Sequence, residues 1–417
     1  MTFNALAPGA RDPSNGQEPQ GGREGAAGRL GQPQSRSYRA YHQDRLTAMK
    51  VCVTGATGFL GAHVTQLLCE RGDEVRVTYR DPERLKALRG LGFRRAKADV
   101  LDYRAMRRAV RGAKVLFHTV GYVGSTPAEL VWRLNAHAPV VAVEAAAAEK
   151  LRRVVLTSTI SAVGLSTDGR PADEDTEYPD DWLGLAYPDS KHEGERAALE
   201  AGERHGVEVV VVNPAYLLGV PVDRSQPGET STRTVGNYLR GRLPGVIGSK
   251  MNFSDVRDAA AGHLLAADKG KNGERYILGG VNMSWPQLVD MTAELSGMHY
   301  PVIVMPREIA RVARVREALK LPGPMSVEGY ELMSKDWRFS SSKAERELGY
   351  SSRPMRETLL DTIGWYEELI AEGAFAREED SALSSIAGLT RRANRLGLLS
   401  PVRFGQSLAG RRVLAGM

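Results

Sequence analysis

Between residues 50 and 214 the chain alternates short apolar runs with longer segments of helical periodicity. The predicted strands are Lys50–Thr54, Glu74–Tyr79, Arg95–Ala98, Lys114–His118, Val154–Ser158 and Val207–Val212. The predicted helices are Phe59–Arg71, Pro82–Arg89, Ala128–Lys150 and Tyr187–His205. Strands that alternate with helices of this length predict an α/β fold with a Rossmann-type, doubly wound parallel sheet. The valine-rich strands indicate that helices cover both faces of the sheet.

Beyond Pro214 the alternation weakens, and short helical and loop segments continue to about Ala371. This predicts a smaller C-terminal substrate-binding lobe over residues 215–372. The nucleotide-binding domain then covers residues 49–214, with a returning segment at about 251–280. Residues 1–48 are rich in Gly, Pro, Gln, Ser and Arg, which predicts a disordered extension or, alternatively, a true start at Met49. Residues 373–417 predict a basic, flexible tail, with a basic amphipathic helix on a membrane surface as the alternative.

The net charge of +6 comes from the two ends of the 417-residue chain. Residues 1–48 carry +2 and residues 373–417 carry +4, so the segment between them is neutral. A neutral body argues against a nucleic-acid partner. No apolar run reaches the roughly 18–20 residues of a membrane span. The lack of such a run predicts a soluble protein. Two cysteines are too few for a disulfide framework, which predicts a reducing, cytoplasmic setting.

A glycine-rich turn, Thr54-Gly-Ala-Thr-Gly-Phe-Leu-Gly61, follows the first predicted strand and opens the first helix. Gly55 permits a tight turn, Gly58 lets a pyrophosphate approach the backbone, and Gly61 lets the helix pack close to the strand. The free N–H groups and the helix dipole then face the phosphates. In this strand–turn–helix context the motif favours dinucleotide binding over an ordinary glycine turn.

The second predicted strand ends in Tyr79 and Arg80, where NAD-binding proteins carry an acidic residue for the ribose. Arg80 can pair with a 2′-phosphate, so NADP(H) is the predicted cofactor, and NAD(H) is the alternative because Asp81 follows. Asp99, after the third strand, is placed either to meet the adenine amino group or to cap a helix.

Tyr187 and Lys191 lie four residues apart in a predicted helix and therefore share one face. A nearby ammonium group lowers the pKa of a phenol, which would make proton transfer by Tyr187 feasible near neutrality. Thr157-Ser-Thr159 lies at the carboxyl end of the fifth strand, where open α/β sheets bind ligands. A hydroxyl group there can hold a substrate oxygen, although β-favouring threonines alone would explain the run.

Together these features resemble the extended short-chain dehydrogenase/reductase superfamily, in particular its dihydroflavonol-reductase and 3β-hydroxysteroid-dehydrogenase-like branch. The resemblance covers about residues 50–370. It rests on Thr54–Gly61, Val75–Pro82, Asp99–Asp102, Leu116–His118, Asn135, Thr157–Thr159, Tyr187–Lys191, Asn213-Pro214, Phe253–Asp258, Ser342–Ala344 and Leu348–Tyr350. It implies Thr159, Tyr187 and Lys191 as a catalytic trio, with no metal. It implies a cofactor site of Gly55, Thr57, Gly58, Phe59, Leu60, Gly61, Arg80, Asp99, Val100, Tyr187, Lys191 and Asn213.

The resemblance implies an oxidoreductase that moves a hydride between nicotinamide and a carbonyl or secondary alcohol of a small substrate. It also implies a homodimer, paired through the helices at 128–150 and 187–205. Tyr122, Trp182, Tyr216 and Phe253 either line an apolar pocket or are simple packing. A nucleotide-sugar epimerase or dehydratase that retains NAD(P) is the first alternative, and a non-catalytic NADP-binding sensor is the second.

Overall fold

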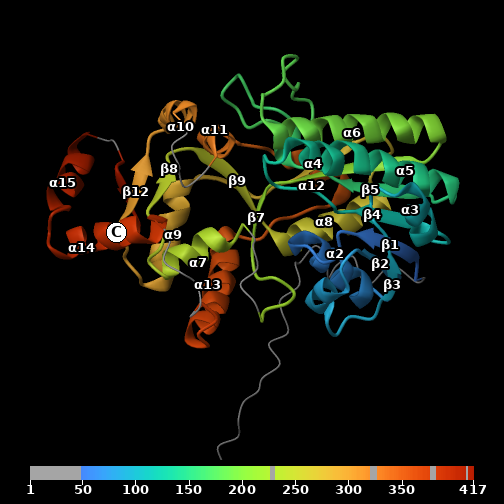
Figure 1. The fold of residues 1–417 in the computed structure, drawn as a ribbon, viewed down its shortest axis with the longest axis horizontal. Helices are drawn as coiled ribbons and strands as arrows, with labels where there is room; N and C mark the ends of the chain where they lie inside the picture. The colour runs from blue at the N-terminus through green and yellow to red at the C-terminus, as the bar shows by residue number, and fades with distance from the viewer. Residues whose placement is uncertain (1–47, 226–230, 320–325, 376–381, 410–411) are drawn as a thin grey trace, which may run out of the picture. The chain divides into compact units, whose positions relative to one another are not determined.

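The computed structural model describes residues 48–225, 231–319, 326–375, 382–409 and 412–417. Within them the largest sheet has seven strands in the order β10-β6-β5-β4-β1-β2-β3, and all neighbours are parallel. These strands are β1 (Lys50–Thr54), β2 (Glu74–Tyr79), β3 (Arg94–Lys97), β4 (Val115–His118), β5 (Arg153–Thr157), β6 (Glu208–Pro214) and β10 (Arg275–Leu278). The order reverses between β1 and β4, where such sheets bind dinucleotides. The predicted Rossmann-type α/β fold is confirmed (Figure 1).

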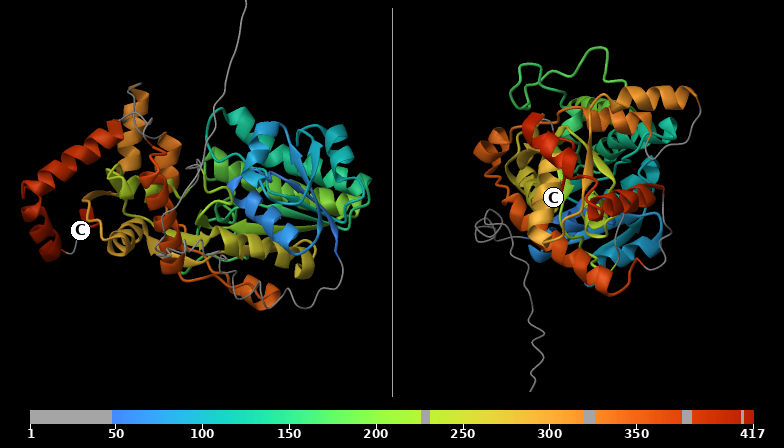
Figure 2. Two further views of the ribbon diagram at one scale, coloured as in Figure 1. Left: turned by 90° about the horizontal axis from the view of Figure 1, so that it is seen from below. Right: turned by 90° about the vertical axis from the view of Figure 1, so that its left-hand side faces the viewer.

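Helices cover both faces of this sheet (Figures 1 and 2). One face carries α2 (Phe59–Glu70) and α8 (Val256–Lys269), and the other carries α3 (Tyr103–Val110), α5 (Ala138–Ala148) and α6 (Ala186–His205). Alternate residues of a strand point to opposite faces, so Val51 and Val53 join the first core and Cys52 joins the second. Burial raises the pKa of the Cys52 thiol to about 12, so this cysteine acts as a small apolar residue.

Two segments predicted as α-helices have another helical form in the structure, in whole or in part. The segment predicted at Pro82–Arg89 is a 3-10 helix, η1 (Pro82–Leu88), whose first turn is capped by the Asp81 carboxylate. The long helix predicted at 128–150 consists of α4 (Ala128–Trp132), a π-helical turn η2 (Arg133–His137) and α5. Pro139 explains the interruption, because it has no N–H to donate to the carbonyl group of Asn135.

The residues after β6 form a second, smaller core with two three-stranded sheets, β11-β9-β7 and β13-β12-β8. Their strands are β7 (Tyr216–Leu218), β8 (Gly245–Ile247), β9 (Lys250–Asp255), β11 (Val281–Ser284), β12 (Val302–Met305) and β13 (Leu414–Ala415). The helices are α7 (Arg233–Leu239), α9 (Trp285–Ser296), α10 (Ile309–Ala318), α11 (Val327–Ser334) and α13 (Met355–Ala371). One more helix, α12 (Ser342–Leu348), packs instead on α8 and β10 of the large sheet. Of the returning segment predicted at about 251–280, α8 covers the large sheet and β10 joins its edge.

The described part of residues 373–417, for which a basic, flexible tail is predicted, contains helices and a strand. These residues form α14 (Ala382–Arg395), α15 (Ser400–Ala409) and β13, which pairs with β12. Two contacts hold the end of the chain: Arg412 pairs with Asp290, and the Gly416 N–H donates to the same carboxylate at 2.8 Å. Ala387 and Leu414 are buried, so small apolar residues in the tail supply the packing.

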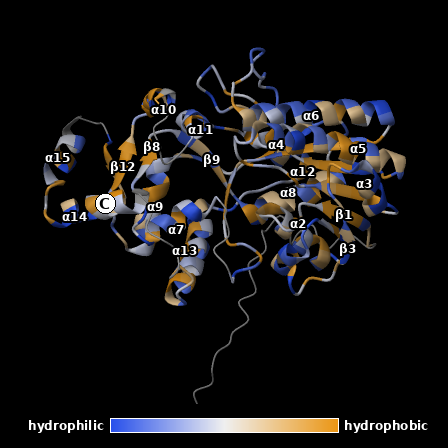
Figure 3. Cartoon of the chain, viewed as in Figure 1, coloured by the Kyte–Doolittle hydropathy of each residue, from blue (hydrophilic) through white to orange (hydrophobic). Residues whose placement is uncertain are grey.

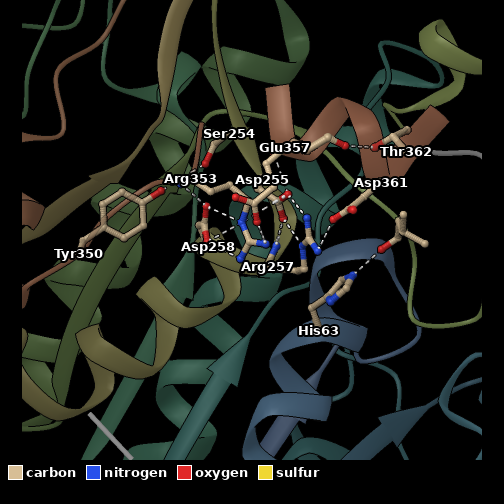
Figure 4. Close-up of polar contacts among 12 residues, drawn as sticks. His63, Ser254, Asp255, Arg257, Asp258, Tyr350, Arg353, Glu357, Asp361 and Thr362 are labelled. Carbon is tan, nitrogen blue, oxygen red and sulfur yellow. Dashed lines mark hydrogen bonds and ion pairs between the residues drawn. The ribbon is translucent and has the colours of Figure 1, made fainter. Parts of the chain in front are cut away.

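A buried ion network joins β9 and the start of α8 to the N-terminal end of α13 (Figure 4). Arg353 binds Asp258 at 2.9 Å and lies 3.6 Å from Asp255, and all three side chains are almost completely buried. Arg257 also binds Asp255, at 2.7 Å. Buried charges of opposite sign compensate each other's lost hydration, so removing one partner is costly.

No helix among the described residues is long and apolar enough to cross a membrane. The disorder predicted for residues 1–48 falls on a segment of which residues 1–47 lie outside the described part of the chain.

Candidate active site

The loop after β1 is built around close backbone contacts. Gly55 has a φ of +73°, a conformation that favours glycine. A Cβ atom at Gly61 would lie 2.2 Å from the Gly55 carbonyl oxygen, so the start of α2 packs too closely for any side chain there. Thr119, directly after β4, donates its hydroxyl to the Thr54 carbonyl oxygen at 2.6 Å. The loops at the two strand ends that flank the crevice are therefore tied together.

The beginning of α2 fits a pyrophosphate group. Gly58 is the N-cap of this helix, and no side chain caps its free N–H groups. Gly58 is exposed, and a Cβ atom there would meet only the Gly55 carbonyl oxygen, at 3.3 Å. Thr57, Phe59 and Leu60 are half-buried around it. Uncapped N–H groups on a bare glycine backbone form the surface that an anion binds at a helix N-terminus.

Arg80 and Asp99 lie at the ends of neighbouring strands. Their charged atoms are 3.9 Å apart, and the side chains are 61% and 44% exposed, so the pair is loose. Asp99 also accepts the Leu101 N–H at 2.9 Å, in agreement with a local capping role. Asp81 is engaged by the N–H of Glu83, and Val100 is buried in the core. Arg80 thus reaches solvent beside the crevice and is able to bind an anion.

The structure brings Thr159, Tyr187 and Lys191 together. Thr159 follows β5, and its side chain lies close enough to the Tyr187 phenol, in the first turn of α6, to lower the pKa of that phenol. The Lys191 ammonium group, one helical turn later, donates to the Thr157 carbonyl oxygen at 2.7 Å. A hydroxyl, a phenol and an ammonium group therefore meet at the carboxyl end of β5.

The expected lowering of the Tyr187 pKa is wrong for this structure. Burial raises the pKa of the phenol, and the hydrogen bond with Thr159 offsets this only in part. Burial also lowers the pKa of Lys191 to about 8, because desolvation disfavours the ammonium form. With Lys191 directed at a carbonyl group, Tyr187 stays protonated at neutral pH.

Two asparagines hold the backbone next to this cluster in place through hydrogen bonds. The fully buried Asn213 donates to the Thr159 carbonyl oxygen and to Glu195, both at 3.0 Å. Asn135, in the π-helical turn, accepts the Tyr122 N–H at 2.8 Å and donates to the Tyr122 carbonyl oxygen at 3.0 Å. Asn135 thereby fixes the loop after β4 beside Lys191.

A buried carboxylate in α6 organises the loop that precedes the helix, and our reading of the sequence missed it. Asp189 accepts hydrogen bonds from the Tyr178 hydroxyl at 2.6 Å and from the Leu183 and Leu185 N–H groups at 3.0 and 2.8 Å. The Tyr178 ring stacks on His192, with 3.9 Å between centroids. Asp189 and His192 thus hold residues 178–185 against the helix that carries Tyr187 and Lys191. The signal that could have found it is the carboxylate itself, which stands in the first turn of the helix.

A cavity of about 520 Å³ lies over the N-terminal end of α6. Its lining comes from the loop after β4, the loop before α6, and α10 with α11: Ser125, Thr126, Leu183, Gly184, Leu185, Arg314, Glu317, Ser326, Val327, Glu328, Glu331 and Lys335. Glu328 accepts the Tyr187 N–H at 3.2 Å, and Arg314 is paired with Glu331. Thr159, Tyr187 and Lys191 are not among the lining residues, and Glu328 links the cavity to the backbone of Tyr187. The volume of the cavity suits a small-molecule ligand.

The predicted aromatic pocket residues do not line this cavity. Phe253 and Tyr216 pack edge-to-face with Trp285 in the core of the lobe. Trp182 packs on His192 and is 39% exposed. Simple packing therefore accounts for these three aromatic residues.

Known proteins share this architecture and these motifs. The model of the NAD dependent epimerase/dehydratase family matches residues 51–279. Sterol demethylase protein B of Methylococcus capsulatus is 31% identical over 77% of this chain and 99% of its own length. Cinnamoyl-CoA reductase 1 of Arabidopsis thaliana is 30% identical over 76% of this chain and 89% of its own length.

A solved nucleoside-diphosphate-sugar epimerase from Pseudomonas aeruginosa superposes with a TM-score of 0.65 and 25% identity, covering 77% of this chain and 98% of that one. The match spans both the large sheet and the smaller lobe. These similarities confirm the resemblance to the extended short-chain dehydrogenases/reductases. The chain belongs to the NAD-dependent epimerase/dehydratase family and is an NAD(P)-dependent oxidoreductase.

Proposed function

We propose that this protein is an NADP(H)-dependent reductase or dehydrogenase that interconverts a carbonyl and a secondary alcohol on a small, largely apolar substrate. The observation that carries the proposal is the convergence of Thr159, Tyr187 and Lys191 at the carboxyl end of β5, where Lys191 donates to the Thr157 carbonyl oxygen at 2.7 Å. When bound, the nicotinamide cofactor supplies or accepts the hydride.

In this proposal Tyr187 holds the proton that the carbonyl oxygen takes up on reduction. The raised pKa of the phenol suits a proton donor at neutral pH, because the group starts in its protonated form. Thr159 orients the same oxygen and stabilises the negative charge that develops on it. Asn213 holds the backbone of Thr159, so the hydroxyl is preorganised.

Lys191 has two roles in the proposal. Its ammonium group now donates to the Thr157 carbonyl oxygen, and the same group would hold the nicotinamide ribose. The glycine loop of residues 55–61 would bind the pyrophosphate, and Arg80 the 2′-phosphate of NADP(H). Asp99 would lie near the adenine.

The cavity favours a reductase over a nucleotide-sugar epimerase. Three carboxylates and two cations line it, and Arg314 is already paired with Glu331. A nucleoside diphosphate carries negative charge that these carboxylates would repel. The relative named for sterol demethylation supports an apolar substrate, and the relatives named as reductases support reduction at a carbonyl carbon. The epimerase alternative rests on the solved nucleoside-diphosphate-sugar epimerase.

The experiment that tests the proposal measures NADPH and NADH turnover against a panel of ketones, hydroxysteroids and nucleotide sugars. Net oxidation of NADPH with an apolar carbonyl compound supports it. Conversion of a nucleotide sugar with retained cofactor and no net redox change would establish the epimerase instead. Tight NADPH binding without turnover on the whole panel would favour the sensor.

Cofactor choice has its own test. Arg80→Ala should weaken NADPH binding by roughly 1.5–3 kcal/mol, the range for a hydrogen bond to a charged group, and leave NADH binding little changed. Fluorescence titration of both cofactors measures this, with exposed Arg84→Ala as the matched control. Equal losses for NADPH and NADH would show that Arg80 does not contact the 2′-phosphate.

A further inference from the structure

The helices α14 and α15 expose large apolar side chains to solvent. Leu389 is 68% exposed, Leu396 74% and Phe404 68%. Ile386, Leu398 and Val402 are exposed as well. Exposed apolar residues that gather on one short stretch of chain, rather than singly, mark an interaction surface. We call the exposed residues of this helix pair, Ile386, Leu389, Arg392, Arg395, Leu396, Leu398, Val402, Arg403 and Phe404, the C-terminal patch.

The helical spacing separates the apolar residues from the side of α14 that packs on the lobe. Ser384, Ala387 and Arg391, spaced three and four residues apart, are buried or half-buried, and Arg391 stacks over the Tyr300 ring. Leu389 and Leu396, seven residues apart, lie together on another face. The turn after α14 is apolar too (Figure 3). The exposed leucines therefore do not belong to the core of the lobe.

The charge of this stretch has a single sign. Residues 382–409 contain Arg391, Arg392, Arg395 and Arg403 and no acidic residue. Arg392 and Arg395 are exposed, and neither forms an ion pair with a described residue. Arg392, three residues after Leu389 and four before Leu396, lies on the same face as these leucines, so cationic and apolar groups face solvent together.

We propose that the C-terminal patch docks on the surface of an anionic phospholipid bilayer. A helix that bears arginines and an exposed leucine, followed by a turn with further exposed leucines, has the pattern of a segment that lies in the headgroup region. The arginines meet the lipid phosphates, and the apolar side chains enter the acyl boundary. The length of α14 and α15 agrees with binding at the surface, since no described helix can span a membrane.

Charge complementarity selects this occupant over a second copy of the chain. Two such patches facing each other would oppose six arginines without a carboxylate in the same segments, which is repulsive. A bilayer that contains acidic lipids offers the opposite charge together with an apolar layer. The inference is independent of the proposed reaction, because it uses no residue of the candidate active site.

The test measures co-flotation of the full-length protein with vesicles of phosphatidylcholine alone or mixed equally with phosphatidylglycerol. Binding should require the acidic lipid and fall steeply with salt. Arg392→Gln with Arg395→Gln should weaken it about 25-fold, at about fivefold for each arginine. Leu389→Gln with Leu396→Gln should weaken it about tenfold or more, from lost apolar burial.

The matched controls are Leu360→Gln, a leucine on α13 that is 50% exposed, and Arg104→Gln, an exposed arginine on α3. Both should bind vesicles as the parent protein does, and thermal melts should show that all variants fold. Binding that survives both double substitutions would overturn the proposal, as would equal binding to neutral vesicles. Failure to float, combined with a lower solution mass for the leucine variant, would assign the patch to self-association instead. Binding of short DNA without vesicle binding would likewise overturn it.

Discussion

The two sides of the active site are held in place by different means. On the cofactor side, the loop after β1 is fixed by its backbone: Gly55 turns at positive φ, and Gly61 leaves no space for a side chain. On the substrate side, the loop before α6 is fixed by side chains, chiefly the carboxylate of Asp189. A loop that is fixed by its backbone suits the cofactor, which is the same ligand whatever the substrate. A loop held by side chains can be altered residue by residue, which lets one scaffold take different substrates.

Tyr187 lies where the two sides meet, so its removal should have the largest effect. Tyr187→Phe keeps the ring but removes the proton proposed to move. Turnover should fall by about 10² to 10⁴, the usual worth of a positioned general acid, while cofactor affinity hardly changes. Steady-state kinetics and fluorescence titration measure the two quantities.

Two companion variants control this result. Thr159→Ser should keep most of the turnover, whereas Thr159→Val should lose it, because the proposed role needs the hydroxyl group and not the methyl group. Lys191→Met should lose both turnover and cofactor affinity. Wild-type turnover by Tyr187→Phe would show that the chemistry lies elsewhere.

The second prediction concerns the coupling between the large sheet and the lobe. Arg353→Met should lower the free energy of unfolding by about 3–5 kcal/mol, because it leaves Asp258 and Asp255 buried without a full complement of partners. Urea denaturation measures the loss. Arg356→Met is the control, since its ion pair with Glu294 is exposed and should contribute less than about 1 kcal/mol. Equal losses for the two variants would mean that the network in Figure 4 is not a structural link.

The same contrast explains what the sequence could predict. A glycine that must turn at positive φ, and a strand with valine at every second position, are local signals, so the strands of residues 50–214 and the glycine loop were predictable. The Tyr187–Lys191 pair was predictable from its spacing of four residues. Glu328 contacts the N–H of Tyr187 from 141 residues away, and Arg353 binds Asp258 across 95 residues. Such contacts depend on tertiary packing, and nothing near these residues indicates their partners.

The predicted lowering of the Tyr187 pKa was wrong for the same reason. A helical spacing brings Lys191 to one face but does not say where its ammonium group points or how much water surrounds the phenol. Burial dominates the phenol, and Lys191 is directed at a backbone carbonyl group. The homodimer expected through α4, α5 and α6 stays a prediction, which light scattering can check.

The third prediction sharpens the substrate side. Asp189→Ala removes the acceptor of three hydrogen bonds and should loosen residues 178–185. KM for the carbonyl substrate should rise roughly 10- to 100-fold, the range for losing hydrogen bonds to a charged group. Cofactor affinity should hold, because the loop after β1 is fixed by its own backbone. Tyr178→Phe removes one of the three bonds and should raise KM less. A fall in cofactor affinity equal to the rise in KM would break the distinction between the two sides.

The last prediction has the smallest expected effect. It compares how strongly acid lowers the stability contributed by the large sheet and by the lobe. Burial lowers the pKa of His63 and His263 to about 4 and that of His118 to about 3, and all three lie on or against the large sheet. Their ordinary pKa is about 6.5, so below that pH the unfolded chain binds more protons than the folded one, and stability falls as pH falls. Between pH 7 and pH 5 each should contribute about 1–2 kcal/mol to this loss.

His63→Gln tests this, because glutamine can keep the hydrogen bond to the Val220 carbonyl oxygen without titrating. Urea unfolding at pH 7 and pH 5 should show a pH-dependent loss that is smaller by about 1–2 kcal/mol than in the parent protein. The exposed His299 of the lobe, changed to glutamine, should leave the loss unchanged. If the His63 and His299 variants both lose as much stability between pH 7 and pH 5 as the parent protein, the acid sensitivity does not come from His63. The carboxylates of the ion network around Arg353 would then be the next groups to test.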